Sequence, residues 1–251
     1  MRTWLLLTLL AAACAKPAGG PLKHTFDNTR IAAVPLEAKQ SVTEAQQRHD
    51  LAQLDHKNAS TEYRDAEIEE DLAEHQAENA VVVSQVVASR NAEARPVPDA
   101  ALSRRVADAK VAFMRARRAW FRELASWTLH EVYATQAKLE LERAKIAQAN
   151  NAAPGIDLAV FESQASARAQ AAQTARTAAE AERNNTEAKL AAWAASEQEL
   201  LRAAGIEGSP VESARYTAQW KSLAETLPAP GATDPAAPPA TDPAAPAPPT
   251  S

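Results

Sequence analysis

A small residue recurs at every seventh position along the first half of this 251-residue chain. A straight α-helix repeats every 3.6 residues, so a strict period of seven that is kept over many turns favours a left-handed supercoil against a partner helix. The pattern predicts one long helix over about residues 36–95, with a narrow seam of small side chains. The seam positions are Ala38, Ala45, Ala52, Ala59, Ala66, Ala73, Ala80, Val87 and Ala94.

Larger apolar side chains accompany the alanine seam. We expect them to border it on both sides, so that the helix presents a channel of small residues between two rows of larger ones. Leu51, Leu72 and Val86 form one row, and Leu54, Ile68 and Val82 form the other.

Two proline-containing breaks divide the rest of the chain into further helices. Pro96 and Pro98 cannot continue a helix, and Asp99 is suited to cap the next one. So short a connection favours an antiparallel hairpin, with a second helix over about residues 100–150. A second turn at Pro154-Gly155 is followed by Asp157, which we expect to cap a third helix running to about residue 204.

The second helix carries large residues at the same period of seven: Val106, Phe113, Trp120, Trp127, Ala134 and Leu141. Because large side chains fill the spaces that small ones leave, we predict that Phe113, Trp120 and Trp127 pack against the alanine seam of their own chain. A short fourth helix, capped by Ser209 and running to about residue 227, is expected to pack back on the bundle. Its two apolar faces are Val211, Ala214 and Ala218, and Trp220, Leu223 and Leu227.

The composition agrees with these helices. The chain has only 6 glycines and 5% aromatic residues, and its few β-branched runs leave little material for sheets. The predicted fold class is all-α, an elongated antiparallel helical bundle or coiled coil over residues 36–227. It consists of three long helices and one short helix.

Residues 1–13 have the features of an export signal: Arg2 near the start, a short apolar run over 4–10, and three alanines at 11–13. With Cys14 directly after them, they resemble a bacterial lipoprotein signal, although Ala11 stands where leucine is commonest. The resemblance implies that Cys14 is lipidated and that the chain is anchored in the bacterial cell envelope. Since the next residue is Ala15 and not aspartate, it also implies the outer membrane, facing the periplasm. The alternative is ordinary cleavage after residue 13, which leaves a free thiol.

The segments that flank the predicted bundle lack a helical period. Residues 14–35 contain Pro17, Gly19, Gly20 and Pro21, and we expect them to form the lipid anchor and a flexible tether. Residues 228–251 are rich in proline and alanine, with the repeat TDPAAP at 233 and 241. They cannot bury enough apolar area to offset the entropy of ordering, so we expect a disordered tail.

An acidic run on the first helix and a basic run on the second are the strongest charge signals. With a hairpin that turns near Val97, Arg115 lies level with about Asn79 and Arg122 with about Leu72. We expect the two runs to neutralise each other and to fix the register. The alternative is a strip that binds anionic lipid or cell-wall glycan, because basic residues beside aromatic ones suit a membrane interface. This strip consists of Arg115, Arg117, Arg118, Trp120, Phe121 and Arg122.

No sequence motif indicates catalysis, a cofactor or a metal site. There is no nucleophile elbow, phosphate-binding glycine loop, paired-cysteine cluster or zinc helix motif. Asp71, His75 and Glu78 share one helix face, but no second helix supplies matching ligands. The net charge of −5 gives no reason to expect nucleic acid.

Together these features predict a cell-envelope lipoprotein, not an enzyme, that acts as a structural scaffold, spacer or adaptor through coiled-coil interactions. The expected partners are the membrane, through the N-terminal lipid, and an envelope protein or a second copy of the chain. The alternative function is a lipid- or cell-wall-glycan-binding module that uses the strip on the second helix.

Overall fold

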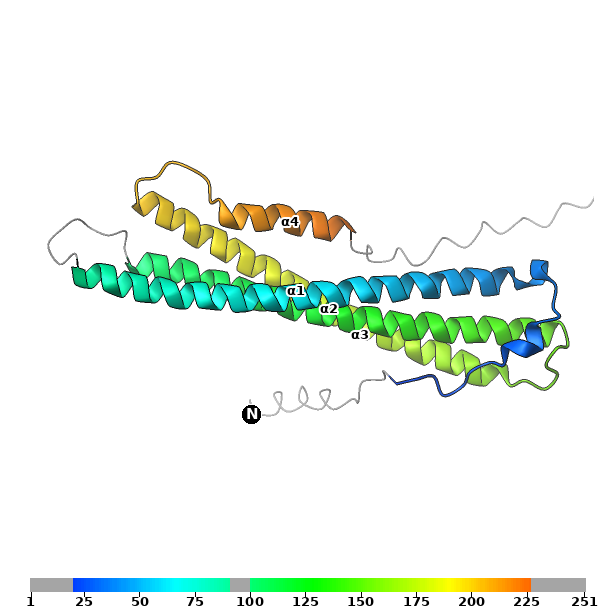
Figure 1. Ribbon diagram of the computed structural model, residues 1–251. Coiled ribbons are helices and arrows are strands. Elements are labelled where there is room, and N and C mark those ends of the chain that lie inside the picture. Colours follow the sequence, from blue (N-terminus) through cyan, green and yellow to red (C-terminus); the bar gives the residue numbers. More distant parts are fainter. Residues whose placement is uncertain (1–19, 91–99, 227–251) are drawn as a thin grey trace, which may run out of the picture.

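The computed structural model describes residues 20–90 and 100–226, and within these ranges the chain is all-α (Figure 1). Three long helices, α1 (Gln40–Arg90), α2 (Ala100–Ala149) and α3 (Leu158–Ala203), are followed by the short α4 (Glu212–Thr226). Two 3₁₀ turns, η2 (Asn28–Ile31) and η3 (Leu36–Lys39), precede α1. The described ranges hold no strand, and the predicted fold class is confirmed. The signal-like segment, Cys14, the first connection at 91–99 and the tail lie outside the described residues.

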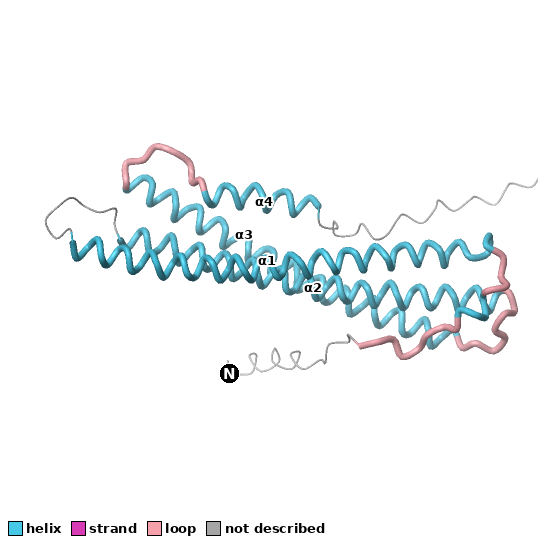
Figure 2. Tube along the Cα trace, in the orientation of Figure 1, coloured by secondary structure: helices cyan, strands magenta, loops and turns pink. Residues whose placement is uncertain are grey.

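The long helix α2 is the centre of the molecule, and both α1 and α3 pack along it (Figure 2). The three helices have 51, 50 and 46 residues, which at 1.5 Å per residue gives lengths of about 69 to 77 Å. They run alternately up and down and lie side by side, which makes the bundle long and narrow.

Hydrogen bonds at the helix ends explain why the predicted boundaries were close. The Asp157 side chain accepts from the Ala159 N–H and caps α3. At the end of α3, Gly205 has a φ of 67°, and the Ile206 N–H donates to the Leu201 carbonyl. That pairing is the usual stop for a helix that ends in a left-handed glycine. Asn151, with a φ of 53°, plays the same part after α2.

The start of α4 differs from the prediction. Ser209 lies three residues before the helix and does not cap it; a glutamate of α3, Glu197, accepts from the Glu212 and Ser213 N–H groups at 3.3 and 3.1 Å. The helix does pack back on the bundle as predicted, and it uses the face that contains Trp220. Val211, on the other expected face, is 82% exposed.

The alanine seam of α1 is buried over five successive repeats: Ala45, Ala52, Ala59, Ala66 and Ala73. Lys110 bonds to Gln76 and Arg117 to Glu69, and the same offset sets Phe113 level with Ala73 and Trp120 level with Ala66. These four residues belong to one apolar core, at whose edge Trp127 is half-buried. The predicted fit between small and large side chains is therefore confirmed. Ala38 and Ala80 are exposed, and the side chains of Val87 and Ala94 are not described.

The larger residues of α1 do not border the seam. Leu51, Leu54, Ile68, Leu72 and Val82 are 53 to 66% exposed and lie on the outer side of the helix. The prediction failed because positions two and six residues after a seam position point away from α2 on a helix. Val86 lies among the residues whose side chains are not described.

Residues 20–35 do not behave as the predicted tether. Phe26, Ile31 and Val34 are buried in a second apolar core with Leu141 and Phe161, near the end of the bundle where α2 meets α3. The Phe26 N–H donates to the Glu140 carboxylate at 2.6 Å, and Arg168 donates to the Gly20 carbonyl at 2.8 Å. Three apolar side chains without a helical period thus fix this segment against the bundle.

We expect the substitution Ala66→Leu to lower the free energy of unfolding by about 1 to 3 kcal/mol, because a larger side chain overpacks the contact with Trp120. Ala66 is 1% exposed. Urea denaturation followed by circular dichroism measures the change. The matched control is Ala80→Leu, an exposed position of the same row, which we expect to change stability by less than about 0.5 kcal/mol. Equal effects of the two variants would contradict the packing of the seam.

Candidate functional site

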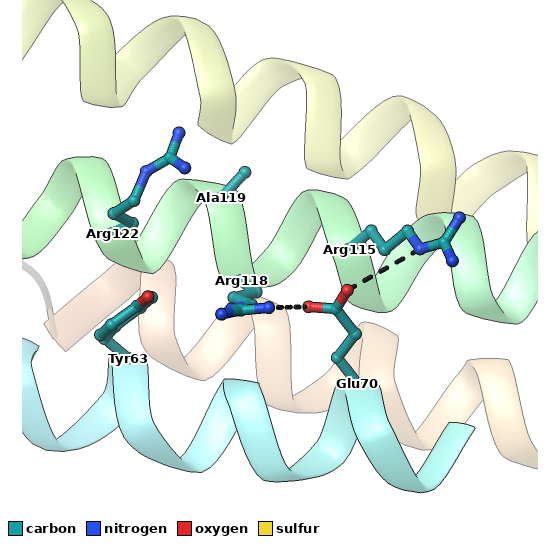
Figure 3. A pocket seen from close by; sticks show the side chains of 6 residues that line it. All are labelled: Tyr63, Glu70, Arg115, Arg118, Ala119 and Arg122. Carbon is teal, nitrogen blue, oxygen red and sulfur yellow. Dashed lines mark hydrogen bonds and ion pairs between the residues drawn. The ribbon is translucent and has the colours of Figure 1, made fainter. Parts of the chain in front are cut away.

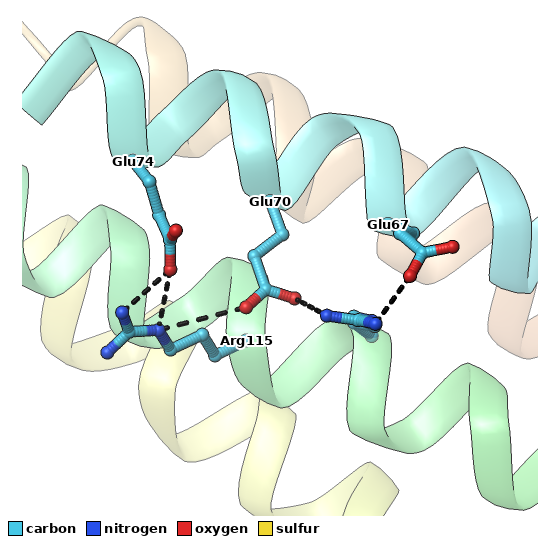
Figure 4. Close-up of polar contacts among 5 residues, drawn as sticks. Glu67, Glu70, Glu74 and Arg115 are labelled. Carbon is cyan, nitrogen blue, oxygen red and sulfur yellow. Dashed lines mark hydrogen bonds and ion pairs between the residues drawn. The ribbon is translucent and has the colours of Figure 1, made fainter.

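The acidic run of α1 and the basic run of α2 lie against each other, as Figure 4 shows. Arg115 donates to Glu74 at 2.6 Å, and its Nε lies 3.7 Å from Glu70. Arg118 bridges Glu70 at 3.2 Å and Glu67 at 2.5 Å. The expected mutual neutralisation of the two helices is confirmed.

The register of this charge network differs from the predicted one. Arg115 lies opposite Glu70 and Glu74 and not near Asn79. The prediction took the position of the turn from the prolines at 96 and 98. The packing of the large residues of α2 against the alanine seam sets the register instead.

Arg117 occupies a different position from its neighbours. Its side chain is only 9% exposed, and it is paired with Glu69, whose side chain is 37% exposed. The guanidinium lies 5.2 Å from the Phe121 ring and 5.9 Å from the Tyr216 ring of α4. This arginine therefore joins α1, α2 and α4 and is not available to a ligand.

The six residues predicted to form a binding strip do not share one surface. Trp120 and Phe121 are 3% and 0% exposed, and the Trp120 ring lies 4.5 Å from that of Trp220. Successive residues of a helix point about 100° apart, so a run of neighbours surrounds the helix. Arg117 is buried with the two aromatic side chains, while Arg115, Arg118 and Arg122 stay at the surface. The strip is thus corrected to three surface arginines.

These three arginines line an open hollow of about 240 Å³ between α1 and α2, together with Tyr63, Glu70 and Ala119 (Figure 3). Contacts with Tyr63 and Glu70 raise the pKa of Arg118 above its ordinary value. Arg122 pairs with the adjacent Glu123 at 3.1 Å. Because glutamates already neutralise all three guanidinium groups, the hollow offers little net positive charge to an anion.

A second polar row, which the sequence did not reveal, crosses the interface of α1 and α2. His49 and His56 lie one heptad apart, and each contacts a threonine of α2 at 3.2 Å, Thr135 and Thr128 respectively. Each threonine hydroxyl also donates to a carbonyl of its own helix. When the hydroxyl proton is directed at that carbonyl, the threonine oxygen can accept from Nδ1–H of the histidine. A signal that could have revealed this row is the spacing: the two histidines are seven residues apart, and so are the two threonines.

His130, Tyr133 and Arg168 meet where residues 20–21 cross α3. The Arg168 guanidinium lies 5.3 Å from the Tyr133 ring. Burial, with a smaller contribution from the Arg168 charge, lowers the pKa of His130, which favours the neutral imidazole. Through the bonds of Arg168 to the Gly20 and Pro21 carbonyls, this group fastens the N-terminal segment to the bundle.

Within residues 20–90 and 100–226, no cluster of three or more histidine, cysteine, aspartate or glutamate side chains is placed to hold a metal ion. No helix in these ranges is long and apolar enough to cross a bilayer. Several charged side chains of the described chain join helices, among them Arg105 to Glu199, Lys110 to Glu212 and Arg117 to Glu69.

The fold and the contacts define an all-α elongated helical bundle with an internally neutralised charge network. Comparison of the chain with protein-family models, with curated proteins and with solved structures gave no match.

Proposed function

We propose that this chain is a lipoprotein of the bacterial cell envelope that acts as a structural scaffold, spacer or adaptor. In this proposal Cys14 carries the lipid, and the protein is held at the outer membrane facing the periplasm. The export-like segment at 1–13 and the cysteine directly after it support the anchor.

The structural role is supported above all by the polar contacts between α1 and α2. The arginines and glutamates between α1 and α2 bind one another, and the histidines bind threonines across the same interface. Side chains used in this way fix the alignment of α1 against α2, two helices about 75 Å long. A long body with a fixed alignment suits a spacer or scaffold, whose task is to hold partners at a set separation.

The attachment of residues 20–35 determines which end of such a body lies near the membrane. Cys14 precedes Gly20 by six residues, and even a fully extended chain of six residues spans only about 22 Å. Gly20 bonds to the side chain of Arg168 of α3, so an acylated Cys14 keeps Gly20, beside this part of α3, within about 22 Å of the lipid headgroups. The proposal therefore places this end of the bundle near the bilayer.

The anchor is tested by the intact mass of the mature protein and by its distribution between membrane and soluble fractions. We expect the amino terminus at Cys14, an added mass of several acyl chains, and recovery with the membranes, because two or more chains give stable attachment. The variant Cys14→Ser should lose the acyl mass and leave the membrane fraction. A mature terminus at Cys14 without acyl mass would overturn the anchor.

The scaffold role is tested by crosslinking in intact cells. We expect discrete adducts of the chain with an envelope protein or with itself. Recovery of lipid or glycan alone, abolished by changing Arg115, Arg118 and Arg122 to glutamate, would instead support the binding-module alternative. Arg117 is left unchanged in that variant because it is buried.

A further inference from the structure

The outer side of α1 carries a regular row of exposed apolar residues. Leu54, Ile68 and Val82 are spaced by fourteen residues and are 53%, 66% and 57% exposed. They lie opposite the face that the alanine seam and His56 present to α2. Because the seam stays against α2 from Ala45 to Ala73, the opposite row stays turned to solvent along the same length. The described residues of this bundle leave the row uncovered.

A charged row runs beside this apolar row, one residue every heptad. It consists of two cations followed by two anions: Lys57, Arg64, Asp71 and Glu78. All four are exposed. Within the described part of the chain, Glu78 lies 3.6 Å from His75 of its own helix, and the other three form no ion pair.

The centres of symmetry of the two rows lie within half a residue of each other. The apolar row is symmetric about Ile68, and the charges change sign midway between Arg64 and Asp71. A second helix of the same sequence, turned antiparallel about that point, sets Leu54 against Val82 and Ile68 against Ile68. It also sets Lys57 against Glu78 and Arg64 against Asp71, each pair twice. A surface that complements itself about a twofold axis is the requirement for a symmetric dimer.

We infer that α1 is a self-association surface, and that its occupant is α1 of a second copy of this chain in antiparallel orientation. The contact extends from Leu54 to Val82, about 42 Å along the helix. A parallel copy would place the charged row beside Asn58, Asp65, Leu72 and Asn79 of its partner. Only Arg64 would then meet an opposite charge, so the charges select the antiparallel arrangement. This inference depends on α1 alone and stands whether or not Cys14 carries a lipid.

Charge reversal tests the inference on the full chain, with the dimer dissociation constant measured by analytical ultracentrifugation. We expect a dimer for the unchanged protein. Arg64→Asp or Asp71→Arg alone should raise the dissociation constant about tenfold at low salt, since each replaces two attractive pairs by two repulsive ones. The double variant Arg64→Asp/Asp71→Arg should restore it to within about threefold, and about 1 M salt should remove the differences.

The control is Arg48→Asp, an exposed arginine of α1 that lies outside both rows and should leave the dissociation constant unchanged. A monomer at every concentration, or a double variant as weak as the single ones, would overturn the inference.

Cysteine substitutions test the orientation independently. In the antiparallel dimer, Ile68→Cys forms a disulfide with its own copy on oxidation, as does a mixture of Leu54→Cys and Val82→Cys chains. Leu54→Cys alone should remain uncrosslinked. The unchanged chain, with Cys14 as its only cysteine, gives the background. Crosslinking of Leu54→Cys alone would show a parallel pair and contradict the inference.

Discussion

The substitution Trp193→Ala is expected to lower the free energy of unfolding by about 3 to 5 kcal/mol, the range for removing a large aromatic side chain from a core. Trp193 is fully buried, stacks on Phe113 with ring centroids 5.5 Å apart, and lies 5.5 Å from Tyr216. It therefore joins α3 to both α2 and α4. For a chain of this size the loss corresponds to a melting temperature lower by about 6 to 20 °C, measured by circular dichroism.

The control for this prediction is another tryptophan of the bundle, Trp127, which is half-buried at the edge of the same core. Its indole donates to Glu131 and lies beside Arg176. We expect Trp127→Ala to cost clearly less, because little of the surrounding space becomes a cavity. Trp193→Phe keeps most of the ring contacts and should fall between the two. Equal losses for Trp193→Ala and Trp127→Ala would contradict a core centred on Trp193.

Helix positions in this protein could be predicted from local signals, because the residues that start and stop its helices act over a few positions. Asp157 and Gly205 are examples. The start of α4 could not be found in this way. Its free N–H groups are satisfied by Glu197, a side chain fifteen residues earlier on another helix. Only the packing of α4 on α3 brings the two together.

Packing faces were predictable only where the period was strict. The alanine seam and the row of Phe113 and Trp120 were identified correctly, since a seven-residue repeat keeps one face toward its partner. Phe26, Ile31 and Val34 have no such period and lie among turns, so the core that they fill with α2 and α3 could not be predicted.

The candidate binding strip shows how far a functional site can be predicted from the sequence. A run of basic and aromatic residues is a property of the sequence, whereas a surface depends on the direction of each side chain around the helix. Arg117 and Arg118 are neighbours in the chain, yet one is buried and the other lies beside an open hollow. The seven-residue spacing of Phe113 and Trp120 would have shown that this part of α2 faces inward.

The pair formed by Arg117 and Glu69 yields the second large effect. We expect Glu69→Ala to cost about 3 kcal/mol, because it leaves the guanidinium of Arg117 buried without a counter-charge. Arg117→Met removes the charge and keeps an apolar side chain of similar length. The Glu69 side chain is 37% exposed, so water can solvate the carboxylate that remains. The expected cost of this substitution is below about 1 kcal/mol. Urea denaturation of both variants measures this asymmetry.

A second glutamate of α1 provides a matched comparison. Glu74 has the same side-chain exposure as Glu69, 37%, but its partner Arg115 is 62% exposed. Glu74→Ala should therefore cost only about 0 to 1 kcal/mol, the usual value for an exposed pair. Combining Glu69→Ala with Arg117→Met should return most of the stability that Glu69→Ala loses, because no buried charge is left unpaired. If Glu69→Ala and Glu74→Ala cost the same, the burial of Arg117 does not determine the strength of the contact between α1 and α2.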